Sequence, residues 1–316
     1  MKPETLGIAL WAENLAHPIN GLRGWLSLVE SQIVAAKGEG AKLFVLPEYT
    51  SAHWLAWAPP QLKPTETIAW MAEIGEEALA QLGQLARRYD IGIVAGSMPV
   101  AHEGKEVATA ASPYVNRAWI LLPEGDGTMR RTHHDKLVLT PSECDPENWL
   151  LATGNKLRIY EWRGLRFAVL ICLDVEMPGL AVLLAKQDID LLIVPSMTSR
   201  NSGFHRVFDC AKARAVELYC VVAVVGGIGD VKTPAGVETN FSGAACFVPC
   251  DVEFGTHGVM ERVAPAGAVQ GPGPMLVTQL PVAAIFRSRR KGGEVWPGAF
   301  DTGHIETVPP QPSVAG

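Results

Sequence analysis

The chain has 316 residues, 48% of them hydrophobic, which is enough apolar surface for one large α/β domain or two of ordinary size. Its 27 basic and 33 acidic residues give a formal net charge of -6 without a block of like charge, so a nucleic-acid partner is not expected and small molecules are favoured. The six cysteines form neither a Cys-x-x-Cys pair nor a close Cys/His group, which argues against a zinc site and a disulfide framework and predicts a reduced, cytoplasmic setting.

Apolar runs and stretches of helical period alternate along the chain. This alternation predicts a layered α/β fold with buried parallel strands. The N-terminal apolar stretch is too short for a signal peptide, and the longest apolar run, around 220–229, is too short for a membrane span. Strands are expected at 5–11, 42–47, 91–97, 166–172, 190–195 and 220–226, and helices at 18–37, 68–89, 179–187 and 204–217.

Two pairs of segments resemble each other. AKLFVLPEYTS at 41–51 is similar to IDLLIVPSMTS at 189–199, and YDIGIVAGSM at 89–98 is similar to LYCVVAVVGG at 218–227. Two similar halves would form two facing sheets with helices outside, although unrelated buried strands also look alike. Beyond about 285 the sequence is rich in Gly and Pro, which predicts one domain over 1–285 and a tail over 286–316, either at a subunit interface or disordered at its end.

A cysteine ends the buried strand at 166–172, and two carboxylates follow it. Cys172 has the position of a nucleophile elbow, because a turn and a helix beginning near Gly179 come next. The positive end of that helix would favour a thiolate. By itself, a buried cysteine is more often a small apolar residue than a nucleophile. The presence of Asp174 and Glu176 directly after an apolar strand therefore calls for an explanation.

Two further segments carry candidate partners for the thiol. Pro47 ends the second strand and brings Glu48 to its carboxyl end, where open α/β sheets bind ligands. Lys136 follows MRRTHHD, and Glu143 lies seven residues further on. Each of these residues alone is more often a solvated surface charge.

Together these segments resemble one family. Glu48 in LPE, Lys136 in DKL and Cys172 in ICLDVEMP match the order and approximate spacing of the nitrilase superfamily of carbon–nitrogen hydrolases, over residues 5 to about 285. The resemblance implies an αββα sandwich of four layers, with two facing mixed sheets and helices outside. It also implies Glu48 as general base, Lys136 as the cation and Cys172 as nucleophile, with a second glutamate at Glu143 or, alternatively, Glu147.

The chemistry explains these residue types. Amides are poor electrophiles with poor leaving groups, so a covalent thioester divides one difficult displacement into two steps. Glu48 would move the protons, while Lys136 and the backbone N–H of Leu173 would bind the oxyanion. The expected activity is hydrolysis of a non-peptide C–N bond in a small linear amide or carbamoyl compound. It requires no cofactor, and no metal is expected because His133 and His134 lack a third ligand at suitable spacing.

The segment after the cysteine departs from the family pattern. Many amidases read C-x-D-x-R-F-P-E, whereas this chain reads CLDVEMPG, with Glu176 in place of the arginine. Glu176 either selects against carboxylate-bearing substrates or pairs with Arg200 or Arg206. Nitrile-cleaving members typically have Cys-Trp-Glu, which Leu173 and Asp174 do not match, so amide hydrolysis is favoured. Nitrile hydrolysis and a non-catalytic binding member of the fold are the alternatives.

Further candidates for substrate contact come from sequence position. Trp54, Trp57 and Trp149 flank the triad segments and either line the pocket or belong to the core, and Trp54 is taken as the candidate. The polar loop after the strand at 190–195 lies at the same edge, and Thr198 is its candidate contact. The family usually associates through helices near the active-site face, so the resemblance implies a homodimer or a larger homo-oligomer.

Overall fold

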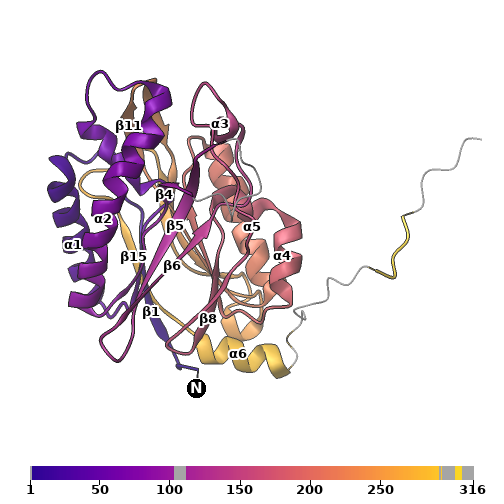
Figure 1. The fold of residues 1–316 in the computed structure, drawn as a ribbon. Helices are drawn as coiled ribbons and strands as arrows, with labels where there is room; N and C mark the ends of the chain where they lie inside the picture. The colour runs from indigo at the N-terminus through magenta and orange to yellow at the C-terminus, as the bar shows by residue number, and fades with distance from the viewer. Residues whose placement is uncertain (1, 103–111, 292, 294–302, 308–316) are drawn as a thin grey trace, which may run out of the picture.

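The computed structural model describes residues 2–102, 112–291, 293 and 303–307. Two mixed β-sheets face each other, and helices cover the outer face of each (Figure 1). Helices α1 (Gly21–Gly38) and α2 (Thr67–Tyr89) lie on one side, and α4 (Pro178–Ala185) and α5 (Asn201–Leu218) lie on the other. The expected αββα sandwich is confirmed.

The first sheet has seven strands in the order β15-β1-β2-β3-β5-β4, with β6 also paired to β5. They are β1 (Leu6–Trp11), β2 (Leu43–Val45), β3 (Gly92–Val94), β4 (Met98–Ala101), β5 (Tyr114–Pro123), β6 (Met129–Asp135) and β15 (Met275–Leu280). The second sheet has six strands in the order β14-β13-β10-β9-β8-β7. They are β7 (Ile159–Trp162), β8 (Leu165–Val169), β9 (Leu191–Ser196), β10 (Val221–Gly226), β13 (Ser242–Phe247) and β14 (Val259–Ala266). A separate hairpin joins β11 (Gly229–Thr233) to β12 (Gly236–Asn240).

The two sheets repeat one topology. Strands β1, β2 and β3 are parallel in the first sheet, as are β8, β9 and β10 in the second. An antiparallel strand flanks each set on both sides. The similar sequence segments occupy equivalent places, and helices α2 and α5 both end in a left-handed residue, Asp90 and Tyr219, before the third parallel strand begins.

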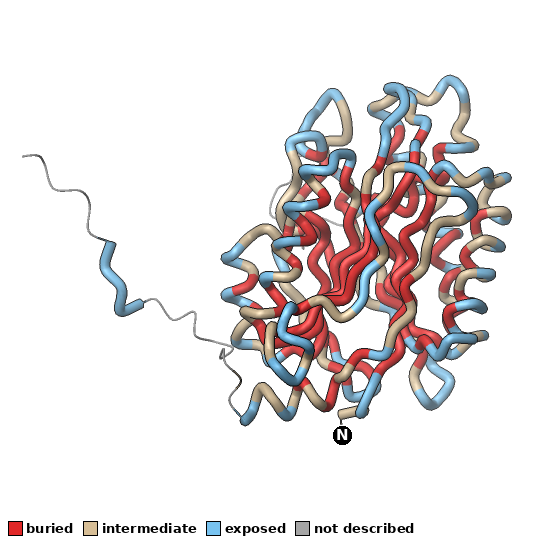
Figure 2. The backbone as a smooth tube through the Cα atoms, turned by 180° about the vertical axis from the view of Figure 1, so that it is seen from behind, coloured by how far each residue is buried: buried red, intermediate tan, exposed pale blue. Residues whose placement is uncertain are grey.

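Strand β1 shows why the predicted strands are apolar throughout. Leu6, Ile8 and Leu10 pack in the core that includes the space between the sheets, whereas Ala9 and Trp11 pack under the helices. Because side chains alternate along a strand, a strand buried on both faces has no polar position. Figure 2 shows these central strands as a continuous buried region.

One aromatic side chain crosses from the second sheet to the first. The Trp162 indole N–H donates to the carbonyl of Pro123, at 2.9 Å. Its ring lies over Gly92, where an added Cβ would come within 2.9 Å of it. A side chain at position 92 would therefore push the two sheets apart locally.

The remaining elements are short. They are the 3-10 helices η1 (Thr50–Trp57), η2 (Pro64–Glu66), η3 (Cys172–Glu176) and η4 (Val252–Phe254), and the α-helices α3 (Pro141–Cys144) and α6 (Val282–Lys291). Helix α6 crosses the expected domain boundary at 285, and most of the expected tail lies outside the described residues. Within those residues, no helix has the length and apolar character needed to cross a bilayer.

Candidate active site

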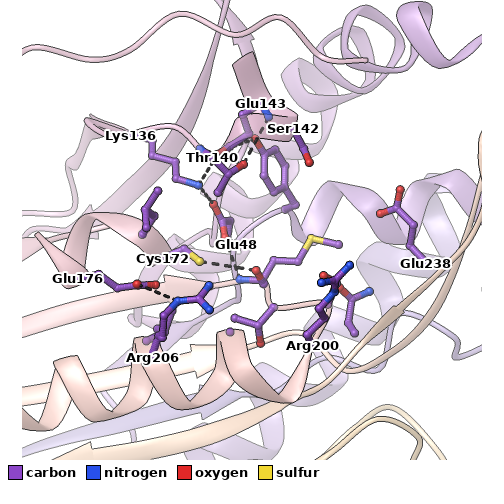
Figure 3. A pocket seen from close by; sticks show the side chains of 18 of the residues that line it. Glu48, Lys136, Thr140, Ser142, Glu143, Cys172, Glu176, Arg200, Arg206 and Glu238 are labelled. Atoms are coloured by element: carbon purple, nitrogen blue, oxygen red, sulfur yellow. Dashed lines mark hydrogen bonds and ion pairs between the residues drawn. The ribbon is translucent and has the colours of Figure 1, made fainter. Parts of the chain in front are cut away.

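A cavity of about 330 Å³ opens where the parallel strands of both sheets reach their carboxyl ends (Figure 3). Its wall includes Glu48, Lys136, Glu143 and Cys172. Glu48 and Lys136 follow strands β2 and β6 of the first sheet, and Cys172 follows β8 of the second. The structure thus brings together four residues predicted from three distant segments.

Glu48 is fixed by a tight backbone arrangement beyond β2. The backbone N–H of Tyr49, which has a left-handed φ of 47°, donates to the Ser97 hydroxyl, at 3.0 Å. Gly96 lies so close to this segment that an added Cβ would be 1.9 Å from the Pro47 carbonyl oxygen, and its φ of +56° also favours glycine. Glu48 is thereby held in the wall of the cavity with only 1% of its surface exposed.

Lys136 bridges two carboxylates. Its ammonium donates to Glu48 Oε1 and to Glu143 Oε2, both at 2.7 Å, and the whole side chain is buried. The strand before it is anchored by Asp135, which accepts two hydrogen bonds from the Arg117 guanidinium. This anchoring limits the freedom of the backbone that carries Lys136.

Glu143 is the better supported of the two alternatives for the second glutamate. Its carboxylate accepts hydrogen bonds from the Tyr49 hydroxyl at 2.6 Å and from the Asn116 amide at 3.2 Å. It also accepts from the backbone N–H of Thr140, at 2.8 Å, in a capping box at the start of α3. Glu147 is exposed and lies outside the cavity wall.

Cys172 and Glu48 both contact Met197, which directly follows β9, the neighbour of β8 in the second sheet. The thiol donates to the Met197 carbonyl oxygen with a sulfur–oxygen distance of 3.6 Å, and the Met197 N–H donates to Glu48 Oε2 at 2.8 Å. Cys172 adopts a left-handed φ of 48°, which is uncommon for a residue with a side chain. Such strain is typical of functional positions, and here it turns the sulfur towards the cavity.

The structure explains why one carboxylate, Asp174, follows the apolar strand. It is fully buried and accepts hydrogen bonds from the backbone N–H groups of Ile171 at 3.0 Å and Val138 at 2.8 Å. It also accepts from Leu137 N–H at 3.1 Å. Asp174 therefore joins the turn that holds Cys172 to the segment directly after Lys136.

Burial and charge set the protonation states of the cluster. Burial, and then the charge of Glu143, raises the pKa of Glu48 to about 6 against the opposing effect of Lys136. Burial and the nearby Glu48 carboxylate raise the pKa of the Cys172 thiol well above its usual range. Burial lowers the pKa of Lys136, but its two carboxylate partners outweigh this and raise it overall. The resting site thus holds a neutral thiol, an ammonium and a carboxylate able to accept a proton near neutral pH.

Three of the residues predicted to contact the substrate line the cavity, but two of them already have partners within the chain. Leu173 and Thr198 both line the cavity, although the Thr198 hydroxyl already donates to the Phe241 carbonyl at 2.6 Å. Glu176 lines it as well and pairs with Arg206, whose Nε lies 3.1 Å from Glu176 Oε2. Of the two alternatives for Glu176, the structure has the ion pair, which removes the physical basis for repelling substrate carboxylates.

The expectation for Trp54 is wrong. This side chain is fully buried, packs edge-to-face on Trp25 at a centroid distance of 5.4 Å, and lies outside the cavity wall. Trp57 likewise packs on Trp70. Trp149 does line the cavity, where it packs on the ring of Tyr49 at 4.7 Å.

Sequence reasoning missed three contributors to the cluster. Tyr49 contacts Glu143, Asn116 contacts both glutamates, and Met197 contributes its backbone. Asn116 did leave a signal in the sequence, because it is an amide within the strand-like run YVNRAWILL, and the structure shows that it is fully buried. Within the described part of the chain, no group of three or more His, Cys, Asp or Glu residues is arranged to hold a metal ion.

Comparisons with known proteins identify a family and a shared fold. A family model described as carbon–nitrogen hydrolase matches residues 16–253. A probable hydrolase, YhcX, of Bacillus subtilis (strain 168) is 26% identical over 75% of this chain and 43% of its own length. An (R)-stereoselective amidase of Pseudomonas sp. is 29% identical over 51% of this chain and 55% of its own length. The matched part thus spans about half of each of these relatives.

Solved structures share the fold. A mutant of the amidase from Nesterenkonia sp. AN1, with the acetamide moiety of fluoroacetamide covalently added at its active-site cysteine, superposes with a TM-score of 0.63. The two sequences are 21% identical, and the match covers 92% of this chain and 97% of that one. At this identity the match supports the fold alone.

Proposed function

The chain belongs to the carbon–nitrogen hydrolase family, and from this premise we propose that it hydrolyses the C–N bond of a small linear amide or carbamoyl compound through a thioester on Cys172. The observation that carries the proposal is the buried cluster in which Lys136 bridges Glu48 and Glu143 beside the thiol. A cavity of about 330 Å³ is at the small end of the range for ligand pockets, which favours a compact substrate.

Acylation would begin with Glu48. Its carboxylate accepts the thiol proton as the Cys172 sulfur attacks the carbonyl carbon, and a tetrahedral oxyanion forms. Lys136 carries three N–H donors, and two of them are committed to Glu48 and Glu143. The third, with the backbone N–H of Leu173, would stabilise the oxyanion. Glu48 then gives its proton to the nitrogen, the C–N bond breaks, and ammonia or an amine leaves.

Deacylation would reverse these roles. A water molecule loses a proton to Glu48 and attacks the thioester carbon. The second tetrahedral intermediate collapses, the carbon–sulfur bond breaks, and Glu48 returns the proton to the sulfur. The products are a carboxylic acid and the free thiol. Glu143 keeps Lys136 charged throughout, because burial alone would lower the lysine pKa.

The proposed cysteine nucleophile agrees with what is known of a protein of the same fold. The Nesterenkonia amidase mutant carries an acetamide moiety on its active-site cysteine, and the Pseudomonas relative is an amidase. Nitrile hydrolysis is the second candidate, since a nitrile carbon would meet the same thiol. A homo-oligomer acting in the cytoplasm remains our expectation from the sequence.

Mass spectrometry tests the proposal. The protein is mixed with pooled amides, and the acyl mass is sought on the tryptic peptide from Phe167 to Lys186, which contains Cys172 as its only cysteine. Cys172→Ser should lose the adduct, whereas Cys144→Ser, at the exposed cysteine beside Glu143, should keep it. A protein that neither acquires an acyl mass nor releases ammonia from any amide would overturn the proposal. Release of ammonia from nitriles but not from amides would favour the second candidate.

A further inference from the structure

The cavity wall carries four charged side chains beyond the catalytic cluster, namely Glu176, Arg200, Arg206 and Glu238. Glu176 and Arg206 neutralise each other at 3.1 Å. Among the described residues, neither Arg200 nor Glu238 has an ion-pair partner. Figure 3 draws Arg200 and Glu238 to the right of Cys172, away from Lys136 at the upper left. This part of the cavity wall thus contains one positive and one negative side chain, both exposed to solvent and without an ion-pair partner among the described residues.

The positive charge is reinforced by a helix end. Arg200 directly precedes α5, which has no side-chain cap, and the first internal bond of that helix runs from Phe204 N–H to the Arg200 carbonyl at 3.1 Å. The N–H groups of residues 201–203 have no acceptor within the described chain, and two of these residues, Ser202 and Gly203, line the cavity. An uncapped helix N-terminus beside an arginine attracts a carboxylate.

The negative charge is reinforced by a buried acceptor. Glu238 and Asn240 are two residues apart on strand β12, so they lie on the same face of the strand, and both line the cavity. Asn240 is 1% exposed; its amide nitrogen donates to the Gly229 carbonyl at 3.2 Å, and its Oδ1 has no hydrogen-bond partner. Glu238 is exposed on the strand, although the neighbouring cavity wall partly desolvates its carboxylate and raises its pKa. A carboxylate and a buried amide oxygen without donors together suit an ammonium group.

We propose that the substrate is an amide whose remote end carries both a carboxylate and an ammonium group, as in the side-chain amide of an α-amino acid. The carboxylate would contact Arg200 and the start of α5, and the ammonium would contact Glu238 and Asn240. This inference rests on the proposed function, because it orients the scissile amide towards Cys172. A ligand with both charges can contact both side chains, whereas a ligand with one charge can use only one of them, so the structure favours the zwitterion.

Four matched amides test the inference. L-glutamine carries both charges, 4-carbamoylbutanoate only the carboxylate, 4-aminobutanamide only the ammonium, and butanamide neither. Arg200 and Glu238 are exposed, and an exposed ion pair contributes about 0.2 to 1 kcal/mol, so each charge should raise kcat/KM for ammonia release by up to roughly 5-fold. L-glutamine is therefore expected to be the best substrate of the four.

Variants assign each charge to its residue. Arg200→Gln should bring the ratio of kcat/KM for L-glutamine over 4-aminobutanamide close to one. Glu238→Gln should do the same for the ratio of L-glutamine over 4-carbamoylbutanoate. Arg87→Gln and Glu77→Gln, at exposed positions of α2, are matched controls that should leave both ratios as they are. Because each result is a ratio within one variant, a general loss of folded protein cancels.

The outcomes separate the two proposals. Turnover of butanamide with no advantage for L-glutamine, or ratios that do not respond to Arg200→Gln and Glu238→Gln, would overturn the zwitterion and leave the amidase proposal standing. Failure of all four amides, together with the absence of any acyl mass on the Cys172 peptide from the pooled library, would remove both.

Discussion

Replacing Lys136 with methionine removes the one ammonium that bridges Glu48 and Glu143. The substitution keeps an apolar stem of similar length, so the main change is the loss of charge and of the donors. Both oxygens that accept from the lysine are 2.7 Å away, and both carboxylates are almost fully buried. The variant would therefore hold two neighbouring buried carboxylates without their shared cation.

The size of the effect follows from these distances. At an effective dielectric constant of about 20, each contact is worth about 6 kcal/mol of Coulomb attraction, most of it opposed by the cost of burying the ammonium. Breaking a buried pair usually costs about 3 to 5 kcal/mol of unfolding free energy. Loss of the oxyanion donor should further lower kcat by roughly 100-fold to 1,000-fold.

The stability lost in Lys136→Met depends on pH. Lys136 lowers the pKa of Glu48, which is already raised to about 6 from an ordinary 4.5, so removing the lysine raises that pKa further. A carboxyl group whose pKa is higher in the folded protein contributes most stability below its unfolded pKa and loses it as pH rises through the folded pKa. Relative to the wild type, the variant should therefore lose more unfolding free energy at pH 8 than at pH 5. The difference is about 1.4 kcal/mol for each unit by which the loss of the lysine raises the folded-state pKa of a carboxyl group.

Urea unfolding at several pH values, with kcat/KM profiles for an accepted amide, measures these effects. Lys42→Met, at an exposed position before β2, is the matched control and should change neither quantity appreciably. If Lys136→Met unfolded with the same free energy as Lys42→Met at every pH, and kept the wild-type position of the acidic limb, the bridging role would be refuted.

Three further predictions concern the proposed general base and two residues that hold the site in place. In the wild type, kcat/KM should rise as pH increases through about 6, where Glu48 becomes able to accept a proton, and a profile flat from about pH 5 to 7 would exclude it as the base. Asp174→Ala leaves three backbone N–H groups unpaired and should lower the unfolding free energy by about 3 kcal/mol in urea titrations, whereas Asp209→Ala, on the exposed face of α5, should have little effect. Gly96→Ala should reduce both thermal stability and kcat, because its Cβ would collide with Pro47, while Gly83→Ala in α2, with open space around it, should raise stability by about 0.5 to 1 kcal/mol.

The six parallel strands were predictable because they are buried on both faces. Strands such as β1 and β10 have no polar position, so a short apolar run between helical segments identifies them. Strands β6 and β14 were not predicted, since their exposed faces carry charged residues such as Arg130 and Glu261 and their pairing depends on distant partners. Antiparallel strands at the edge of a sheet are defined by tertiary contacts more than by composition.

The candidate site was predictable to the level of segments but not of side-chain directions. Glu143 could have been separated from Glu147 by the local pattern TPSE, in which the glutamate caps the backbone of Thr140. The error at Trp54 arose because closeness to Glu48 in sequence does not say which way helix η1 turns the indole. Likewise, the choice of Arg206 rather than Arg200 as the partner of Glu176 depends on how α5 packs beside η3.

Glu48 follows a strand of the first sheet and Cys172 follows a strand of the second. The distance between the two sheets, set by the apolar side chains between them, therefore acts as a spacer that fixes how far the carboxylate lies from the sulfur. Trp162, wedged against Gly92, is part of that spacer although it touches no substrate. A change in the packing of Trp162 against Gly92 would therefore alter the distance between the Cys172 sulfur and the Glu48 carboxylate. The packing of apolar side chains between the sheets therefore helps to place Glu48 and Cys172 relative to each other, in addition to the polar contacts around them.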